Sequence, residues 1–576
     1  MKTLLVGINS KYIHSNLAIF SLKGYACSKR EAYKDEIEIV EYTINNYMEE
    51  ILKDIYLRKP DFIGFSCYIW NMNFVKELCV ELAKVLPDTD IWLGGPEVSY
   101  DAKCRLMDLP KIKGVMIGEG ERTFYEILEA YRNGEGLEKV SGISYRKIDE
   151  IIENPIACPI SLDEIPFPYE DLKKWENKII YYESSRGCPF SCAYCLSSVD
   201  KRVRFRSVDK VLTELKAFQD AKVAQVKFVD RTFNCSKKHA YTIWKYLVEH
   251  DNQITNFHFE ISADLLDDEA FEIFKKMRPG LIQLEIGVQS INPDTITAIG
   301  RKMDLEKLKE RVRQVHQLGN IHQHLDLIAG LPYEDYASFR KSFDWVYDRQ
   351  PDQLQLGFLK LLKGTTMRDK ANEYGIVYRE QSPYEVLFTN WLTYDEVLKL
   401  KEIEEMTELF YNSNQFYWTL HYAMKKESSP FDFFEDLAFY YKEWGYMSQG
   451  NSRLAKYEFF HKYLTLIKKY DTSEVGNLLT YDYCLREKIK KKPFFLPNED
   501  LYRKEKADFF AKRAKELEGK SYRQLVNSSE AIVFDFEPEQ FVASGIKTSS
   551  KELIVFDYSN RNPLNHNASI LYGGQL

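Results

Sequence analysis

Three cysteines stand close together in the stretch "GCPFSCAYC". Cys188, Cys192 and Cys195 are separated by three and then by two residues. Three thiolates on one short loop cannot close a tetrahedral zinc site, and no His-x3–5-His follows to supply a fourth ligand. The spacing instead favours a four-iron cluster with one iron open to a substrate or cofactor. The alternatives are a structural zinc knuckle and a redox pair. The other seven of the ten cysteines are scattered, so we interpret them as small buried apolar residues.

The sequence around this loop alternates strand-like and helix-like patterns. Six βα units predict a partial parallel (β/α)6 barrel over residues 174–375, and such barrels carry their sites at the carboxyl ends of the strands. The cysteine loop follows the first of these strands, so we expect it at that edge. The strand-like runs are 179–185, 225–230, 256–262, 281–288, 322–330 and 353–359, with helical patterns such as 207–220 and 304–319 between them.

Residues 1–140 show a second α/β pattern. Five βα units with both faces covered predict a doubly wound, flavodoxin-like parallel sheet. Ligands bind such sheets at the carboxyl ends of the strands, which here carry "GFSCYIWN", "GGPEVSYD" and "GEGERT". The strand-like runs are 3–8, 36–42, 62–66, 90–95 and 114–118.

The remaining sequence divides into a connector and a C-terminal region. Residues 141–173 predict a linker that begins with a hairpin, turning at Asp149, and continues as a proline-rich irregular segment. Residues 376–576 predict a mainly helical domain with a late strand pair and a mobile polar tail over 559–576. The stretch 414–426 has Phe416, Trp418, His421 and Tyr422 at helical spacing, so this face is either core or part of a substrate pocket.

Composition and charge narrow the class of protein. A net charge of −8 over 576 residues argues against a broad nucleic-acid-binding surface. No apolar run reaches the length of about 18 residues that a membrane span needs. The N-terminal apolar run is too short for a signal peptide and indicates a buried first strand, so we expect a cytoplasmic protein.

The cysteine motif "CPFSCAYC" resembles that of the radical S-adenosylmethionine (SAM) superfamily, C-x3-C-x-aromatic-C, with Tyr194 as the aromatic residue. The resemblance covers roughly residues 175–370. It implies a [4Fe-4S] cluster on the three cysteines, whose open iron chelates SAM. One electron then cleaves SAM to a 5′-deoxyadenosyl radical, which implies a flavodoxin- or ferredoxin-type electron donor. Matching strand ends imply SAM contacts at Tyr194, Asp230, Glu260, Ser262, Glu285, Gln289 and Gly330.

The first region resembles cobalamin-binding domains, in which a Ser-x-Leu strand end precedes a Gly-Gly turn. Here Ser66 and Gly94 are 28 residues apart and Tyr68 replaces the leucine. The cobalt-ligating pattern Asp-x-His-x-x-Gly is missing around His14, so cobalamin is expected without a protein histidine on cobalt. The alternative is a doubly wound module that binds another ligand. The resemblance implies cobalamin contacts at His14, Ser66, Gly94, Gly95, Pro96, Glu97, Gly118 and Glu119.

Together the two resemblances imply a cobalamin-binding radical SAM enzyme with an uncharacterised C-terminal domain. The expected reaction is methylation of an unactivated carbon, or of phosphorus. The same residues allow a non-methylating oxidoreductase or cyclase in which cobalamin relays electrons, and a non-enzymatic cobalamin or redox sensor. The sequence assigns neither a substrate nor a catalytic residue beyond those that hold the cofactors.

Overall fold

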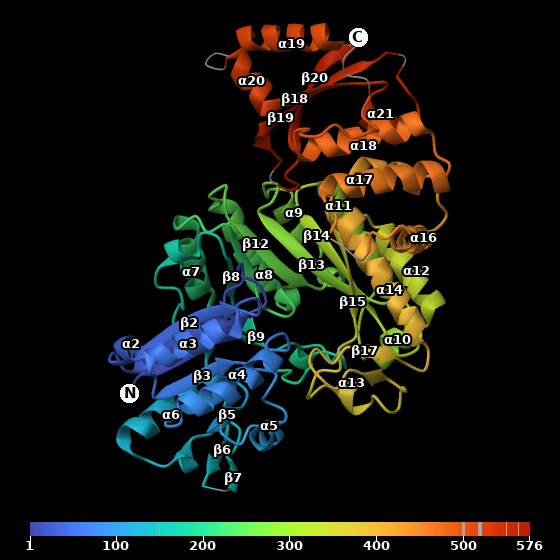
Figure 1. Cartoon of the computed structure of the whole chain (residues 1–576). Helices are drawn as coiled ribbons and strands as arrows, with labels where there is room; N and C mark the ends of the chain where they lie inside the picture. Colours follow the sequence, from blue (N-terminus) through green and yellow to red (C-terminus); the bar gives the residue numbers. More distant parts are fainter. Residues whose placement is uncertain are drawn as a thin grey trace. The chain divides into compact units, whose positions relative to one another are not determined.

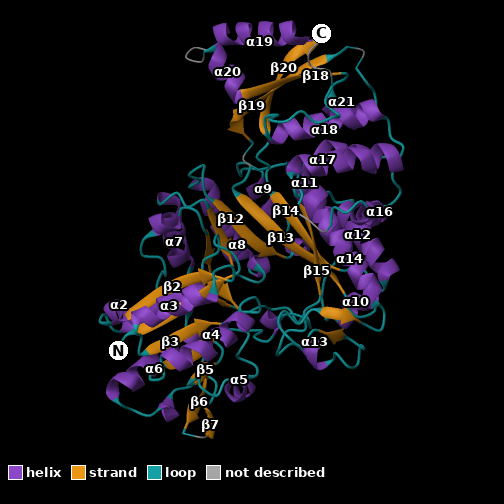
Figure 2. Cartoon of the chain, viewed as in Figure 1, coloured by secondary structure: helices purple, strands orange, loops and turns teal. Residues whose placement is uncertain are grey.

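The computed structural model describes residues 1–148, 150–447, 450–497, 502–516, 521–548, 550–562 and 564–575. The chain forms two compact units, and each is described by itself (Figures 1 and 2). The first unit comprises residues 1–323, 330–335 and 358–393. The second comprises residues 324–329, 336–357 and 394–576.

The first unit begins with a doubly wound sheet, as the sequence predicts. Its strands have the order β2-β1-β3-β4-β5-β6-β7, and β1 to β5 are parallel. The order 2-1-3-4-5 is that of flavodoxin-like folds. The elements are β1 (Thr3–Asn9), α1 (Leu17–Lys29), α2 (Tyr33–Glu36), β2 (Ile37–Thr43), α3 (Met48–Arg58), β3 (Phe62–Ser66), α4 (Met72–Val85), β4 (Asp90–Gly94), α5 (Ala102–Asp108), β5 (Gly114–Met116) and α6 (Gly120–Asn133).

Apolar patterning explains why this sheet is covered on both faces. Every residue of β3 is buried, as expected for a strand between two layers of helices. Helix α4 buries Met72, Val75, Leu78, Cys79 and Leu82, a spacing of three or four residues that forms one apolar stripe. Two separate apolar clusters result, with Leu4 and Ile63 in one and Leu5 and Phe62 in the other.

The hairpin that we placed in the linker extends this first sheet. Strand β6 (Ile143–Lys147) pairs antiparallel with β5, and β7 (Glu150–Glu153) pairs antiparallel with β6. The sheet therefore continues past residue 140 to Glu153. Asp149, at the predicted turn, lies outside the described residues.

The central sheet has six strands in the order β15-β14-β13-β12-β11-β8. Within the first unit, β8, β11, β12 and β13 pair in parallel. This order and direction confirm the predicted α/β class with a parallel central sheet. The elements are β8 (Ile179–Tyr182), α7 (Val208–Asp220), β11 (Gln225–Phe228), α8 (Lys237–Glu249), β12 (Asn256–Ile261), α9 (Asp268–Phe274), β13 (Ile282–Gln289), α10 (Pro293–Ala298), α11 (Leu305–Leu318), β14 (His322–Ala329) and β15 (Gln353–Phe358).

The first unit ends with residues 358–393, which we name the strap. It contains the short elements α13 (Thr366–Asp369), β16 (Val377–Tyr378) and β17 (Val386–Phe388). Met367 donates its backbone N–H to Ala193 O at 2.8 Å, so the strap is bonded to the cysteine loop. Asn73 Nδ2 donates to Ser382 O at 3.3 Å, so the strap also contacts the segment after β3.

The second unit is mainly helical, as predicted, and ends in the antiparallel sheet β18-β19-β20. Strand β20 pairs with β19, so the expectation of a mobile tail over 559–576 was wrong for residues 568–575. The helices and strands are α12 (Tyr336–Tyr347), α14 (Tyr394–Met406), α15 (Tyr417–Met424), α16 (Pro430–Glu443), α17 (Arg453–Lys462), α18 (Thr472–Arg486), α19 (Arg503–Glu516), α20 (Tyr522–Ser528), β18 (Ser529–Phe534), α21 (Pro538–Ser544), β19 (Glu552–Arg561) and β20 (Ala568–Gln575).

The aromatic stretch 414–426 packs inside the second unit. Phe416 is fully buried against Tyr457, and Trp418 packs edge-on against Tyr481 of α18. Asp482 accepts the backbone N–H groups of Trp418 and Thr419, which satisfies the start of α15. These contacts favour the core interpretation of this face. Among the described residues, no helix is long and apolar enough to cross a membrane.

Candidate active site

The cysteine loop lies between β9 (Ser185–Arg186) and a short helical turn at Leu196–Ser198. The thiols of Cys188 and Cys192 are buried and that of Cys195 is half-buried. Cys195 N donates to Cys192 O at 3.1 Å, which closes the loop tightly. All three thiols are free of disulfides. The loop therefore presents three thiols from one turn, largely shielded from solvent, which fits the donor set of an iron–sulfur cluster.

The buried carboxylate of Asp230 fixes the entrance to this loop. Its side chain accepts the Ser184 N–H at 3.0 Å and the hydroxyls of Ser184 and Ser185 at 2.7 and 2.6 Å. Burial raises the pKa of Asp230 to about 6, against the effect of these donors. The described partners of Asp230 are thus protein groups that orient the loop. A direct role in binding SAM stays a prediction.

Arg301 is a neighbour of the loop that sequence reasoning missed. Its Nη1 lies 3.8 Å from Cys192 Sγ and 3.4 Å from the Tyr194 hydroxyl, and its Nη2 donates to Gly287 O. Arg301 thus places a permanent positive charge beside the cluster loop. No sequence signal marks this role, because Arg301 and Lys302 resemble ordinary charges in the turn before a helix.

The predicted strand-end residues gather on one face of the central sheet. Along β13 buried and half-buried residues alternate, and Glu285 and Gln289 lie on the half-buried face. Glu260 of β12 pairs in register with Glu285, and burial raises the pKa of Glu260 to about 7. The Ser262 hydroxyl donates to Asp264 at 2.5 Å. The structure therefore brings Glu260, Glu285 and Gln289 together.

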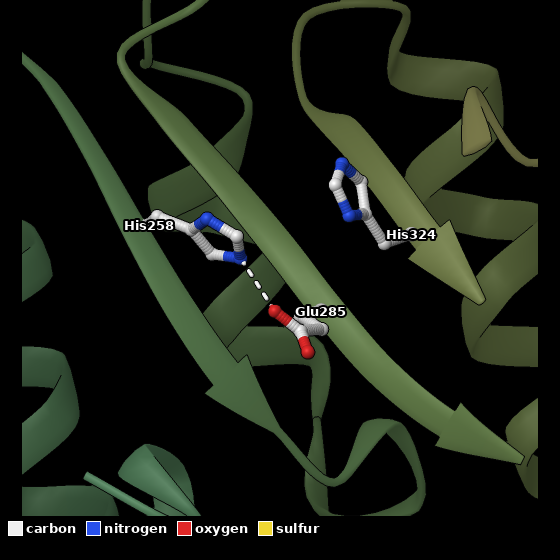
Figure 3. Close-up of side chains that lie close together, drawn as sticks. All are labelled: His258, Glu285 and His324. Carbon is white, nitrogen blue, oxygen red and sulfur yellow. Dashed lines mark ion pairs between the residues drawn. The ribbon is translucent and has the colours of Figure 1, made fainter. Parts of the chain in front are cut away.

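Glu285 is already paired in this structure. His258 Nε2 lies 3.0 Å from Glu285 Oε2, as Figure 3 shows, and Lys227 Nζ lies 2.8 Å from the same oxygen. Burial would raise the pKa of Glu285, but His258 and Lys227 hold it well below its ordinary value. Glu285 therefore neutralises a half-buried lysine, and its predicted contact with the SAM ribose stays a prediction.

Two further predicted SAM positions have unusual backbone geometry. Gln289 has a φ of 71°, and its buried Oε1 has no hydrogen-bond partner among the described residues. Gly330 has a φ of 87°, and a Cβ there would lie 2.8 Å from Val386 of the strap. Gln289 thus keeps an acceptor available for a ligand, whereas Gly330 leaves room for Val386 of the strap.

The cobalamin residues predicted on β3 and β4 lie side by side. Ser66 and Gly94 are partners in the parallel register, and Cys67 N donates to Gly94 O at 2.7 Å. Gly95 has a φ of 109°, and a Cβ there would lie 2.5 Å from Cys67 O. Only glycine permits this approach of two strand ends. Pro96, which follows this turn, is exposed. A cobalamin contact at this edge stays a prediction.

His14 lies at the junction between the first sheet and the central sheet. Its ring Nδ1 is 2.9 Å from the Tyr181 hydroxyl, and its backbone forms a bridge to Ile179 of β8. Burial lowers the pKa of His14, followed in effect by the charge of Lys11. The Tyr181 hydroxyl is thus the described partner of the His14 ring.

Glu97 and Glu119 have protein partners that the sequence did not indicate. Buried Glu97 accepts the Tyr384 hydroxyl and lies 3.2 Å from Lys363 Nζ, both from the strap. Glu119 pairs with Arg204 and lies 3.0 Å from Arg186. A direct cobalamin contact for either carboxylate stays a prediction. Gly118 is exposed beside Glu119, and its N–H donates to Ser99 Oγ at 3.2 Å.

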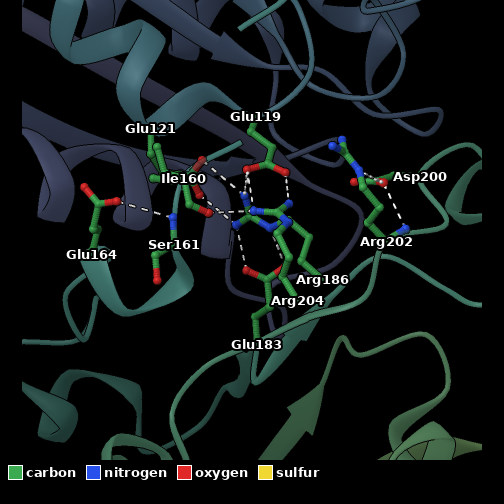
Figure 4. Close-up of polar contacts among 10 residues, drawn as sticks. All are labelled: Glu119, Glu121, Ile160, Ser161, Glu164, Glu183, Arg186, Asp200, Arg202 and Arg204. Carbon is green, nitrogen blue, oxygen red and sulfur yellow. Dashed lines mark hydrogen bonds and ion pairs between the residues drawn. The ribbon is translucent and has the colours of Figure 1, made fainter. Parts of the chain in front are cut away.

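Arg186 is the centre of a network of ion pairs that also includes Glu119, as Figure 4 shows. Its guanidinium lies 2.8 Å from Glu121 and 2.7 Å from Glu183, in addition to Glu119. Arg186 stands two residues before Cys188, whereas Glu119 and Glu121 follow β5 of the first sheet. The network therefore joins the loop that holds the thiols to the carboxyl edge of the first sheet.

Two α/β modules with these sites define a cobalamin-binding radical SAM protein. Residues 3–128 match the family described as "B12 binding domain" and residues 182–346 match "Radical SAM superfamily". The cofactors of this class are a [4Fe-4S] cluster, SAM and cobalamin. Residues 372–556, which include part of the strap and most of the second unit, match "Protein of unknown function (DUF4080)".

Individual relatives agree with this class. The chain is 25% identical over 375 residues to an uncharacterised methyltransferase of Pyrococcus horikoshii, covering 62% of this chain and 79% of that protein. It is 25% identical over 344 residues to the cobalamin-dependent radical SAM methyltransferase TokK of Streptomyces tokunonensis, covering 55% of this chain and 50% of TokK. The chain thus spans about half the length of TokK.

The fold also matches a solved structure. The cobalamin-dependent SAM radical enzyme OxsB, with aqua-cobalamin and SAM bound, superposes with a TM-score of 0.57 at 14% identity. The match covers 84% of this chain and 79% of OxsB. At this identity the likeness establishes the fold, and the activity is argued below from the residues of this chain.

Proposed function

We propose that this protein is a radical SAM methyltransferase that replaces a hydrogen on an unactivated carbon of its substrate with a methyl group. Methylation at phosphorus uses the same cofactors. In the overall reaction one substrate hydrogen leaves as part of 5′-deoxyadenosine and one methyl group enters. Two SAM molecules and two electrons are consumed, and methionine, 5′-deoxyadenosine and S-adenosylhomocysteine are released. An external reductant supplies the electrons, and a flavodoxin or ferredoxin suits this role.

The residues of this chain divide into two cofactor sites under this proposal. Cys188, Cys192 and Cys195 hold the cluster, and the buried guanidinium of Arg301 pairs with the carboxylate of SAM. Gln289 offers its unpartnered Oε1 to a donor of SAM. Ser66 and the Gly94–Gly95 turn form the cradle for cobalamin. When bound, the cluster supplies a single electron to SAM and cobalamin supplies the methyl group.

One observation carries the proposal of methyl transfer: the two cofactor edges are bonded to each other. Arg186, two residues before Cys188, pairs with Glu119 and Glu121 at the carboxyl edge of the first sheet. A methyl donor and a radical generator must act on one substrate atom in turn, so their sites have to face a shared space. A sensor needs no such shared geometry for two cofactors.

Anaerobic incubation of the reconstituted protein with SAM labelled as CD3 and with a reductant tests the proposal. We expect equal amounts of 5′-deoxyadenosine, S-adenosylhomocysteine and a CD3-labelled product in the presence of substrate. Release of 5′-deoxyadenosine with an unlabelled, altered substrate would identify an oxidoreductase or cyclase instead. Release of neither nucleoside product would leave only a binding or sensing role.

A further inference from the structure

Arg231 stands between two residues that contact the cluster loop. Asp230 before it accepts hydrogen bonds from Ser184 and Ser185, which lead into the loop. Thr232 after it is buried, and its Oγ1 lies 3.7 Å from Cys188 Sγ. Because both neighbours are fixed, the backbone of Arg231 is held beside the first cluster cysteine.

The Arg231 side chain lies within electrostatic range of residues from both predicted cofactor sites. Its Nη1 lies 3.9 Å from Glu260 Oε2, at the end of β12. Its charge also acts on the hydroxyl of Tyr68, two residues after Ser66 at the end of β3. The guanidinium therefore stands among the elements that carry the cluster, the SAM strand ends and the cobalamin cradle.

Other arginines near the loop have close partners within the protein. Arg186 has three carboxylates within 3.0 Å, and Arg206 Nη1 lies 3.0 Å from Glu214. Arg301 donates to Gly287 O and reaches Cys192 and Tyr194. In contrast, the Arg231 side chain is 53% exposed, and among the described residues its nearest carboxylate is the one 3.9 Å away. A charged donor in this position can gain short hydrogen bonds from an anionic ligand.

We propose that Arg231 binds an anionic group, a carboxylate or a phosphate, on the substrate of this enzyme. This inference rests on the proposed function, because the substrate must lie between the cluster and cobalamin for methyl transfer. The stacked rings of Tyr68 and Trp70, with centroids 4.3 Å apart, provide an apolar wall beside the same guanidinium. Arg231 thus selects an acidic small molecule and orients its apolar part toward the cofactors.

Anion binding at Arg231 can be tested without turnover. Phenylglyoxal modification of the cofactor-loaded full chain, followed by peptide mass spectrometry, reports the reactivity of each arginine. Inorganic phosphate and glutarate, as probes, should each slow modification of Arg231 several-fold. Arg313 is the internal control, because its side chain is 59% exposed and it pairs with Glu310 on the surface. Equal protection of Arg231 and Arg313, or protection of neither, would overturn the proposal.

The substrate class is tested by turnover. A small-molecule extract is separated on an anion-exchange column, and each fraction is incubated with CD3-labelled SAM, reductant and the loaded enzyme. We expect the labelled product only from the retained, anionic fraction, and elution by charge then separates carboxylates from phosphates. Labelled product from the unretained fraction alone would overturn the inference while sustaining the proposed function. If no fraction is labelled, the proposed function fails, and the modification test still decides whether Arg231 binds an anion.

The variants R231Q and R231K separate substrate binding from cofactor binding. With the labelled compound as substrate, R231Q should raise KM by on the order of tenfold or more, because a charge-assisted hydrogen bond contributes about 1.5–3 kcal/mol. R231K should raise it less. Both variants should bind SAM and cobalamin in the wild-type stoichiometry. An unchanged KM in R231Q, or a loss of SAM or cobalamin from it, would show that Arg231 serves the protein or a cofactor instead.

Discussion

Nη2 of Arg186 lies 2.8 Å from Oε1 of Glu121, and this contact joins the cluster loop to the first sheet. Glu121 stands in the first turn of α6 and is almost fully buried. Burial alone would raise its pKa, but Arg186 holds the pKa of Glu121 below its ordinary value. The Glu121 carboxylate is therefore ionised, and without Arg186 its buried charge would be uncompensated. Arg186 itself keeps Glu119 and Glu183 as partners when Glu121 is removed.

Removing Arg186 should destabilise the first unit. We expect R186M to lower the free energy of unfolding by about 3–5 kcal/mol, because it leaves the buried Glu121 carboxylate without a compensating charge. E121Q should cost less, because Arg186 keeps Glu119 and Glu183 as partners. Urea titration followed by tryptophan fluorescence measures the change. The control is K147M, which removes the exposed pair of Lys147 and Glu138 in the same sheet and should change nothing measurable. Equal unfolding midpoints for R186M and K147M would contradict this account.

The sequence predicted the two parallel sheets well because their strands are continuous apolar runs. The β3 run 62–66, for example, coincides with the observed strand. It also placed Ser66 and Gly94 at one edge, and the register confirms that they are partners. The end of a strand follows from the local pattern of apolar residues, so the sequence alone was enough to locate these strand ends.

The partners of the acidic residues could not be predicted in the same way. Glu97 and Glu119 stand in the turns where ligand contacts are expected, yet their described partners are Lys363, Arg186 and Arg204. Lys363 is 266 positions from Glu97, and no pattern in either segment indicates such a distant pair. Arg301 was missed for the same reason, because only folding brings it to Cys192.

The cluster assignment predicts a loss of iron in a defined variant. Reconstituted protein should hold about four irons and four sulfides. The triple change of Cys188, Cys192 and Cys195 to alanine should abolish both the iron content and the brown absorbance. Cys235 provides the matched control, because it is a half-buried thiol whose pKa is raised by burial and then by the charge of a Cys188 thiolate close to it. Full iron retention in the triple variant, or equal loss in C235A, would disprove the ligand set.

Cobalamin should bind without imidazole on cobalt. The cobalt-ligating sequence pattern is absent, and the described partner of His14 Nδ1 is the Tyr181 hydroxyl. The Co(II) state of the bound cofactor should therefore lack nitrogen hyperfine splitting from a protein histidine in its electron paramagnetic resonance spectrum. H14A should leave that spectrum unchanged. Splitting that disappears in H14A would show that His14 coordinates cobalt.

The buried carboxyl of Asp230 should make stability depend on pH in an unusual direction. Its pKa is raised from 3.8 to about 6 by burial. Because the folded state holds the Asp230 proton more tightly than the unfolded state does, the protonated carboxyl adds to the free energy of unfolding. This contribution is fully present below pH 3.8. It is lost as the pH rises to about 6, and the free energy of unfolding falls by about 3 kcal/mol in total.

The variant D230N isolates this effect, because asparagine keeps an acceptor oxygen for Ser184 and Ser185 but does not titrate. Unfolding midpoints measured between pH 4 and 7 should fall less steeply with pH in D230N than in the wild type. The exposed Asp220, paired with Lys216, gives a matched control in D220N, whose profile should follow the wild type. Parallel profiles for the wild type and D230N would mean that Asp230 does not titrate in this range.

The strap should matter for cobalamin binding through Lys363. This buried lysine places Nζ 2.7 Å from Asp101 and 3.2 Å from Glu97, both in the turn that follows Gly94 and Gly95. K363M leaves buried Glu97 and half-buried Asp101 without this cation, so the turn that forms the proposed cobalamin cradle should loosen. Because charged hydrogen bonds contribute about 1.5–3 kcal/mol, we expect the affinity for hydroxocobalamin, measured by equilibrium dialysis, to fall by about tenfold or more.

K370M is the control within the strap, since Lys370 is exposed and lies 3.9 Å from Glu373. Wild-type affinity in K363M would show that the strap does not support the cobalamin cradle.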